Sequence, residues 1–283
     1  MINFGGSEII YTYNESEIII VPVPYDSTST WIKGADKGPG AILEASCNLE
    51  FYDIETGTEA HRRGIFTLPP VAADSTPEAM VETVRERCQK IYNEKRFPVV
   101  IGGNHSVSIG AMKAASISYD DLTILQIDAH ADLRQEYEGS PLNHACVMAR
   151  AREMAPIVQV GIRSMSLDEI PYADRSRMFC AHELWSDNLL WDRALSLLTE
   201  NVYLTIDLDG FDPGIMPSTG TPEPGGPHYR DIMNFLREVI TGRNLVGFDI
   251  VELCPSPHNK APDFMAARIL YQILSYREFK ASL

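Results

Sequence analysis

The chain has 283 residues, of which 45% are hydrophobic, and it carries a formal net charge of −15 at pH 7. The excess of acidic side chains argues against nucleic acid as a partner, because phosphate backbones are bound by basic surfaces. No run of about 18 or more apolar residues occurs, so no membrane span is expected.

The N-terminal segment and the cysteines indicate a cytoplasmic protein. The first residues, MINFGGSEIIYTYNESE, lack a basic stretch followed by an apolar one, so no signal peptide is expected. The five cysteines are scattered and form no CxxC pair, which argues against a disulfide framework and against a cysteine zinc site. We therefore expect reduced thiols.

Short apolar runs alternate with amphipathic segments along the chain, which is typical of a mostly parallel sheet covered by helices. Strands are expected at residues 17–22, 98–101, 122–127, 156–161, 202–206 and 245–251, with further candidates near 64–67 and 178–180. Helices are expected at residues 39–48, 77–92, 106–116, 144–154, 187–198, 228–241 and 261–276. Ser75 or Thr76 can cap the helix that begins at Pro77. No segment has the composition of a linker, so a single domain over residues 1–283 is predicted.

The segment DAHAD at residues 128–132 directly follows an expected strand. Alternate side chains of extended backbone point to one side, so Asp128, His130 and Asp132 are expected to converge. They would meet beyond the carboxyl end of the strand, where open α/β sheets bind ligands. Two carboxylates and an imidazole suit a divalent metal ion. The alternative is a polar turn with solvated charges.

Two further segments place polar side chains at the same edge of the sheet. Asp207 and Asp209 follow the expected strand VYLTI, and alone they could be a solvated strand end. GGNHS at residues 102–106 brings His105 to the end of another strand. Its two glycines allow a sharp turn and a close approach to a ligand. Alone, His105 could be a hydrogen-bonded structural residue.

The three segments together offer four aspartates and two histidines, which is more than one ion needs. Two ions that share bridging carboxylates fit this number, and such ions lie roughly 3.5–4 Å apart with a hydroxide between them. Four carboxylates would also neutralise two divalent cations. The residues therefore predict a dinuclear metal site that activates water. The irregular segment 210–227, rich in Gly and Pro, is expected to be a functional loop.

At this point the sequence resembles the ureohydrolase family, the arginases and agmatinases, over nearly its whole length. The matching motifs, in the order typical of the family, are PYDSTSTWIKGADKGPGAILEAS at 24–46, GGNHS at 102–106, DAHAD at 128–132, NHA at 143–145, GIRS at 161–164, TIDLDGFDP at 205–213 and DIVELCP at 249–255. The resemblance implies a three-layer α/β/α sandwich with a mostly parallel sheet of about eight strands. It also implies a homo-oligomer, either a trimer or a hexamer.

The resemblance further implies two Mn²⁺ ions, although other divalent ions would fit, and a role for each matching residue. The implied ligands are His105 and Asp132 for one ion, His130 and Asp209 for the other, and Asp128 and Asp207 as bridges. Asp132 would also take part in catalysis. His144 would be the proton shuttle, since the pKa range of histidine suits proton transfer to a leaving amine. Glu252 would pair with the guanidinium group of the substrate.

The resemblance implies hydrolysis of a guanidinium C–N bond with release of urea. Arginases have Asp where Ser164 stands, so recognition of an amino-acid substrate is not expected. The run DLRQEYEGSPLNHA is similar to agmatinases. We therefore expect a small cationic substrate, agmatine, converted to putrescine and urea in putrescine and polyamine biosynthesis. N1-aminopropylagmatine, guanidinobutyrate, arginine and guanidine stay open as alternatives.

Three positions depart from the family pattern. Asn104 stands where Asp or Glu is usual, which would alter the hydrogen bonds around the ligands but not the ligands themselves. Asn143 replaces a common Ser, and the stretch APDFMAARIL at 261–270 replaces a usual Thr-Ala. The last two departures bear on the choice of substrate.

Two other classes share features with this sequence. Metallophosphoesterases also contain Asp-x-His and Gly-Asn-His, but in the reverse order and with a Gly-His-x-His element that is absent here. A non-catalytic scaffold or regulator of the same fold is the second alternative, and it predicts lost ligands, whereas all six are present.

Overall fold

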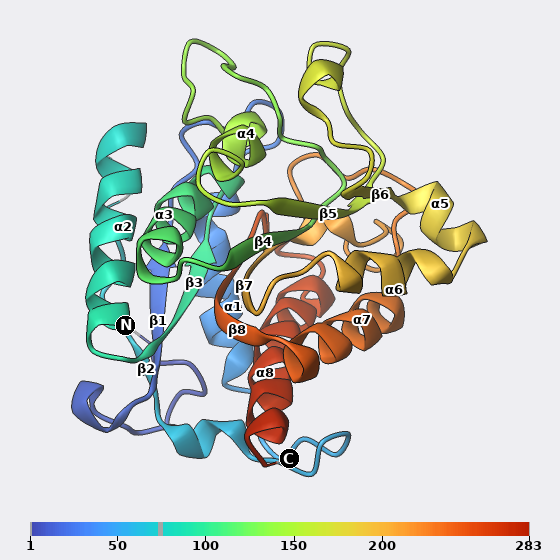
Figure 1. Ribbon diagram of the computed structural model, residues 1–283. Helices are drawn as coiled ribbons and strands as arrows, with labels where there is room; N and C mark the ends of the chain where they lie inside the picture. The colour runs from blue at the N-terminus through green and yellow to red at the C-terminus, as the bar shows by residue number, and fades with distance from the viewer. Residues whose placement is uncertain (1, 73–75, 283) are drawn as a thin grey trace.

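The computed structural model describes residues 2–72 and 76–282. The described residues form one sheet of eight parallel strands in the order β2-β1-β3-β8-β7-β4-β5-β6 (Figure 1). The strands are β1 Ile18–Val23, β2 Ile65–Thr67, β3 Phe97–Gly102, β4 Leu122–Ile127, β5 Ile157–Ile162, β6 Met178–Cys180, β7 Asn201–Asp207 and β8 Asn244–Val251. The expected parallel sheet is confirmed, and the two least certain strands, β2 and β6, form its edges.

The strands are apolar on both faces because both faces of the sheet are covered. In β1 every residue is buried, and neighbours alternate between two cores. Ile18 and Ile20 pack into one core, whereas Ile19 and Val21 pack into the other. Burying one such side chain contributes about 1.5–3 kcal/mol, which explains the continuous Ile and Val runs of the inner strands.

Eight helices of the described chain form the two outer layers. One core includes residues of α1 Gly38–Ser46, α5 Ala181–Ser186, α6 Leu189–Ser196, α7 Tyr229–Gly242 and α8 Ala261–Ser282. The other core includes residues of α2 Pro77–Asn93, α3 Ser108–Ser118 and α4 Val147–Ala151. Figure 1 shows α2 and α3 on one side of the sheet and α1, α7 and α8 on the other. The expected three-layer sandwich is confirmed.

Helix α2 forms as the sequence predicts. The Thr76 hydroxyl accepts a hydrogen bond from the amide of Ala79 at 3.3 Å and so caps the helix, with Pro77 in its first turn. Ser75, the alternative cap, lies outside the described residues. One side of the helix is apolar and buried against the sheet, and it consists of Met80, Val81, Val84, Cys88, Ile91 and Tyr92.

The sheet order brings four strand ends together at one edge. Strands β3, β8, β7 and β4 are neighbours at the centre of the sheet. Their registers pair Ile101 with Ile250, Asp207 with Val251 and Ile127 with Ile206, so the four strands end almost level. Because paired strands lie about 4.8 Å apart, residues that follow these strands are within reach of one another.

The described strands all lie in one continuous sheet, and one domain over residues 1–283 stays a prediction. In the part of the chain that the structure describes, no helix is both long enough and apolar enough to cross a membrane.

Candidate metal centre

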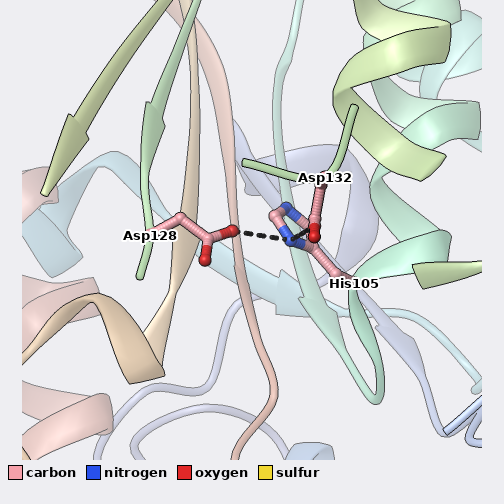
Figure 2. A group of neighbouring side chains, drawn as sticks. All are labelled: His105, Asp128 and Asp132. Carbon is pink, nitrogen blue, oxygen red and sulfur yellow. Dashed lines mark ion pairs between the residues drawn. The ribbon is translucent and has the colours of Figure 1, made fainter. Parts of the chain in front are cut away.

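One group of side chains surrounds the ring of His105 at the end of β3. The Nδ1 atom of His105 lies 3.1 Å from Oδ2 of Asp128 and 3.1 Å from Oδ2 of Asp132 (Figure 2). Oδ2 of Asp207 lies 3.3 Å from the same nitrogen. All four side chains are buried. The structure therefore gathers carboxylates from two strand ends around one imidazole.

A second group surrounds His130, which follows β4. Its Nδ1 atom lies 3.0 Å from Oδ2 of Asp209 and 3.6 Å from Oδ1 of Asp128. Asp128 thus turns one oxygen toward His130 and the other toward His105. This is the arrangement that a carboxylate bridging two ions requires.

The nitrogen and oxygen atoms of these two groups are placed as ligands of metal ions rather than as hydrogen-bond partners of one another. Nδ1 of His105 is buried and has no hydrogen-bond partner among the described residues, although three carboxylate oxygens lie within 3.3 Å. His105, Asp128 and Asp132 could hold one ion, and Asp128, His130 and Asp209 could hold another. Carboxylate oxygens and imidazole nitrogens suit divalent ions such as Mn²⁺.

The pKa values of the acidic groups express the same crowding. Burial and the neighbouring Asp128 carboxylate raise the pKa of Asp132 to about 7. Burial, with Asp209 and Asp128, raises the pKa of Asp207 well above its usual range. Burial acts to lower the pKa of His105, but the surrounding carboxylates raise it well above its usual value. Cations between these carboxylates would remove the repulsion that shifts them.

The backbone at two of these positions is left-handed. Asp132 has a φ of 53°, so the expectation that alternation in extended backbone aligns all of residues 128–132 is wrong at its last residue. Asp132 reaches the ring of His105 because the chain turns at this point. Glu252, directly after β8, has a φ of 65°. Such conformations of non-glycine residues cost about 1–3 kcal/mol each and cluster at functional sites.

The turn after β7 is built by the aspartate that begins it. Oδ1 of Asp207 accepts a hydrogen bond from the amide of Asp209 at 2.9 Å, which closes a short 3-10 turn at Leu208–Gly210. Gly210 has no room for a side chain, since a Cβ there would lie 2.9 Å from the amide nitrogen of Asp128. The turns after β7 and β4 therefore pack backbone against backbone, which places Asp209 beside His130.

Gly103 of the GGNHS segment allows a close approach between two parts of the backbone. A Cβ on Gly103 would lie only 2.1 Å from the carbonyl oxygen of Tyr25, so the close approach is to the protein's own backbone. Asn104 accepts a hydrogen bond from the Ser106 hydroxyl at 2.6 Å and donates one to the Thr28 hydroxyl at 2.7 Å. A carboxylate at this position could only accept, so the Thr28 hydroxyl would have to donate in the second bond. The neutral Asn104 thus ties the His105 turn to the segment 24–46.

A cavity of about 260 Å³ opens above the two groups. Its lining includes Glu252 and His144 beside the metal-binding candidates His105, His130, Asp132, Asp207 and Asp209. Asp128 lies beneath them, fully buried. The structure therefore brings all the residues singled out from the sequence to one place.

Glu252 and His144 reach the cavity from different elements, the end of β8 and the turn His144–Cys146. Oε1 of Glu252 accepts a hydrogen bond from the amide of His105 at 2.8 Å, and burial raises the pKa of Glu252 to about 8. The amide of His144 donates to the Thr28 hydroxyl at 3.3 Å. Burial lowers the pKa of His144 to about 4, which leaves its ring neutral near pH 7. Asn143 accepts the amide of Ala145 at 3.1 Å and begins the short helical turn that carries His144.

Two residues that hold the site together were not identified from the sequence. The Arg163 guanidinium donates to the carbonyl oxygens of Asp209 at 2.6 Å and Glu223 at 2.8 Å, and so fixes the loop 210–227 beside the site. Glu169 accepts the amides of Leu133 at 2.8 Å and of Ser166. Arg163 lies in the GIRS motif, whereas no motif included Glu169.

The protein-family model described as "Arginase family" matches residues 16–275 of this chain. The chain belongs to the arginase family. An N(1)-aminopropylagmatine ureohydrolase from Synechocystis sp. is 38% identical to the present chain over 285 residues. The match covers 96% of this chain and 93% of the relative. An agmatinase from Pyrococcus horikoshii is 31% identical over 265 residues, which cover 92% of each chain.

Solved structures of the arginase family agree with this assignment. The crystal structure of the agmatine ureohydrolase of Thermoplasma volcanium matches with a TM-score of 0.91 and 28% identity, covering 100% of this chain and 96% of that chain. The expected family and fold are thus confirmed, and the chain is an agmatinase-type ureohydrolase of the arginase family. The metallophosphoesterase alternative is excluded by the same match.

Proposed function

We propose that this chain hydrolyses the guanidinium group of agmatine, with two Mn²⁺ ions bound by the six residues named from the sequence. The observation that carries the proposal is one cavity in which two groups of metal-binding candidates lie beside Glu252 and His144. In the reaction, water adds to the guanidinium carbon, and the bond between this carbon and the nitrogen that carries the alkyl chain breaks. The alkylguanidinium and water become an alkylammonium ion and neutral urea.

Glu252 is proposed to bind the guanidinium group. A carboxylate can accept two parallel N–H donors from a planar guanidinium, which also orients the carbon that reacts. Its Oε1 atom is held by the amide of His105, so the carboxylate is fixed relative to the first metal group. The buried position raises the pKa of Glu252 to about 8, and a bound cation would favour its ionised form.

His144 is proposed to move protons. Because burial lowers its pKa to about 4, the ring is neutral and can accept a proton near pH 7. It can then donate that proton to the departing amine, which leaves as an alkylammonium ion. The ring lies edge-on against Tyr137, with 6.3 Å between centroids, and this contact restricts its orientation.

The metal ions would supply the positive charge that activates water and stabilises the charged transition state. His105 and Asp132 would hold one ion, and His130 and Asp209 the other. Asp128 and Asp207 would bridge them. The described contacts support bridging by Asp128 through both of its oxygens. For Asp207 they support one side, because only its Oδ2 atom is described near a histidine ring, that of His105.

The cavity wall bears on the choice of substrate. Ser164 lines the cavity where arginases have Asp, so the wall lacks the carboxylate expected for an amino-acid substrate. This favours agmatine over arginine. N1-aminopropylagmatine, which is agmatine with an aminopropyl group, is the second candidate. It is favoured by the 38% identity to the Synechocystis enzyme of that name, against 31% to the Pyrococcus agmatinase.

A cytoplasmic location, a trimer or hexamer, and a role in putrescine biosynthesis are part of the same proposal. Light scattering of the purified protein tests the oligomer: a mass near three or six times 31.6 kDa is expected, and a monomer would contradict it.

The decisive experiment measures urea release by the manganese-loaded protein. Agmatine, N1-aminopropylagmatine, arginine, guanidinobutyrate and guanidine form the panel. We expect kcat/KM for one of the first two to exceed that for arginine by at least about 100-fold. Urea from none of the five compounds would overturn the proposed activity and favour the scaffold alternative. Preferential hydrolysis of arginine would overturn the proposed substrate.

A further inference from the structure

A chain of buried hydrogen bonds runs from the ring of His105 away from the cavity. Nε2 of His105 lies 2.9 Å from the Thr205 hydroxyl oxygen. The Thr205 hydroxyl donates to Oδ1 of Asp249 at 2.6 Å, and the Tyr203 hydroxyl donates to Oδ2 of Asp249 at 2.8 Å. None of these four side chains is more than 1% exposed. Thr205 and Asp249 are paired in the register of β7 and β8, so the sheet itself fixes their separation.

The positions of the protons follow from this chain. A hydroxyl group has one hydrogen, and that of Thr205 is directed at Asp249. The Thr205 oxygen can therefore only accept from His105, which requires the hydrogen of a neutral ring to sit on Nε2. The Nδ1 atom then presents a lone pair to the cluster of aspartates. The other tautomer would place two lone pairs against each other at Thr205 and a hydrogen where a metal ion should bind.

We propose that Asp249, acting through Thr205, is a positioning residue that holds His105 in the tautomer whose Nδ1 binds the first metal ion. Among the described contacts, Asp249 bonds to Thr205 and Tyr203 and does not line the cavity. It lies in the motif DIVELCP, in which the resemblance assigns a role to Glu252 alone. Carboxylates that orient a metal-bound histidine typically change metal affinity 10- to 100-fold when removed. The inference rests on the proposed function only in taking His105 as a ligand.

The first test replaces Thr205 by Val, which keeps the branched shape and the strand preference but removes the hydroxyl. Titration calorimetry with Mn²⁺ should show about 10- to 100-fold weaker binding of one ion. The other ion, at His130, should bind within about threefold of wild type. Anomalous X-ray scattering at a limiting Mn²⁺ concentration identifies the weakened site as that of His105. Thr205→Ser should restore both affinities, which a loss of packing would not explain.

A second variant, Asp249→Leu, tests the same proposal if Thr205→Val does not fold. Asp249→Leu has a similar branched shape and carries no charge, so it leaves no unpaired carboxylate in the core. It frees the Thr205 hydroxyl to donate to His105, which favours the tautomer that cannot bind metal through Nδ1. The same selective weakening is expected. Tyr203→Phe is the matched control, because it leaves the bond between Thr205 and Asp249 intact, and its metal affinities should stay within about threefold.

The wild-type protein supplies a third measurement that needs no variant. In the zinc-loaded protein labelled with ¹⁵N-histidine, the Nε2 hydrogen of His105 should be protected from solvent exchange by its bond to Thr205. Rapid exchange would overturn the proposal, as would two folded variants that bind both ions like wild type. A wild-type protein that binds no metal would instead overturn the proposed function.

Discussion

Replacing Glu252 by Gln separates the charge of this side chain from its role in the fold. Gln keeps an oxygen that can accept the amide of His105, now 2.8 Å from Oε1 of Glu252, so the turn after β3 should persist. What is lost is the negative charge and one acceptor for the guanidinium group. Truncating one partner of a buried charge pair costs about 2–5 kcal/mol. Because Gln retains one hydrogen bond, we expect the lower part of this range, about 2–3 kcal/mol, or a 30- to 150-fold fall in kcat/KM.

Steady-state urea release over a range of agmatine concentrations measures this effect, and titration with Mn²⁺ shows whether the metal site is unchanged. Glu136→Gln is the matched control, since it makes the same change in net charge on an exposed side chain. A Glu252→Gln enzyme within threefold of wild type in kcat/KM, with both ions bound, would refute the assignment of Glu252 to the guanidinium. Loss of metal together with activity would show that Glu252 acts through His105 instead.

Other substitutions test the remaining roles. Asp128→Ala should abolish binding of both ions and urea release together, measured by metal analysis of a protein whose circular dichroism is unchanged; one retained ion would argue against bridging. His144→Ala should keep both ions but lower kcat by about 100-fold or more, and an unchanged rate would remove the shuttle role. His144 also makes stability depend on pH. Its pKa is about 4 when folded and about 6.5 when unfolded, so the unfolded chain binds the proton more tightly and stability falls as pH drops below 6.5. In metal-free protein, urea denaturation at pH 7 and pH 5 should show wild type losing about 2 kcal/mol more than His144→Gln; equal losses would contradict the burial of this ring.

The sheet could be predicted from the sequence because each inner strand is a short run of Ile, Val and Leu that must be buried on both faces. Helix α5 could not, since AHELWS has too few residues to show a helical period. The expected helices at 106–116 and 144–154 instead begin with 3-10 turns, because the side chains of Asn104 and Asn143 accept the amides two residues on. The strand order, with β8 between β3 and β7, depends on packing of distant segments and leaves no local pattern.

The site divides in the same way between local and distant causes. Residue types and their places after strands were enough to name the aspartates and histidines, because the carboxyl ends of parallel strands meet at one edge. The left-handed turns at Asp132 and Glu252 were not predictable, since Asp adopts this conformation only somewhat more often than other non-glycine residues and Glu shows no such preference. The bonds from His105 to Thr205 and from Thr205 to Asp249 join residues 100 and 44 positions apart. In the sequence, Thr205 reads as an ordinary strand residue and Asp249 as an ordinary buried polar residue. Only their pairing across β7 and β8 links them to the candidate metal site. The sequence motifs therefore name the groups proposed to meet substrate and metal, whereas the groups proposed to set the tautomer of His105 are found through the sheet register.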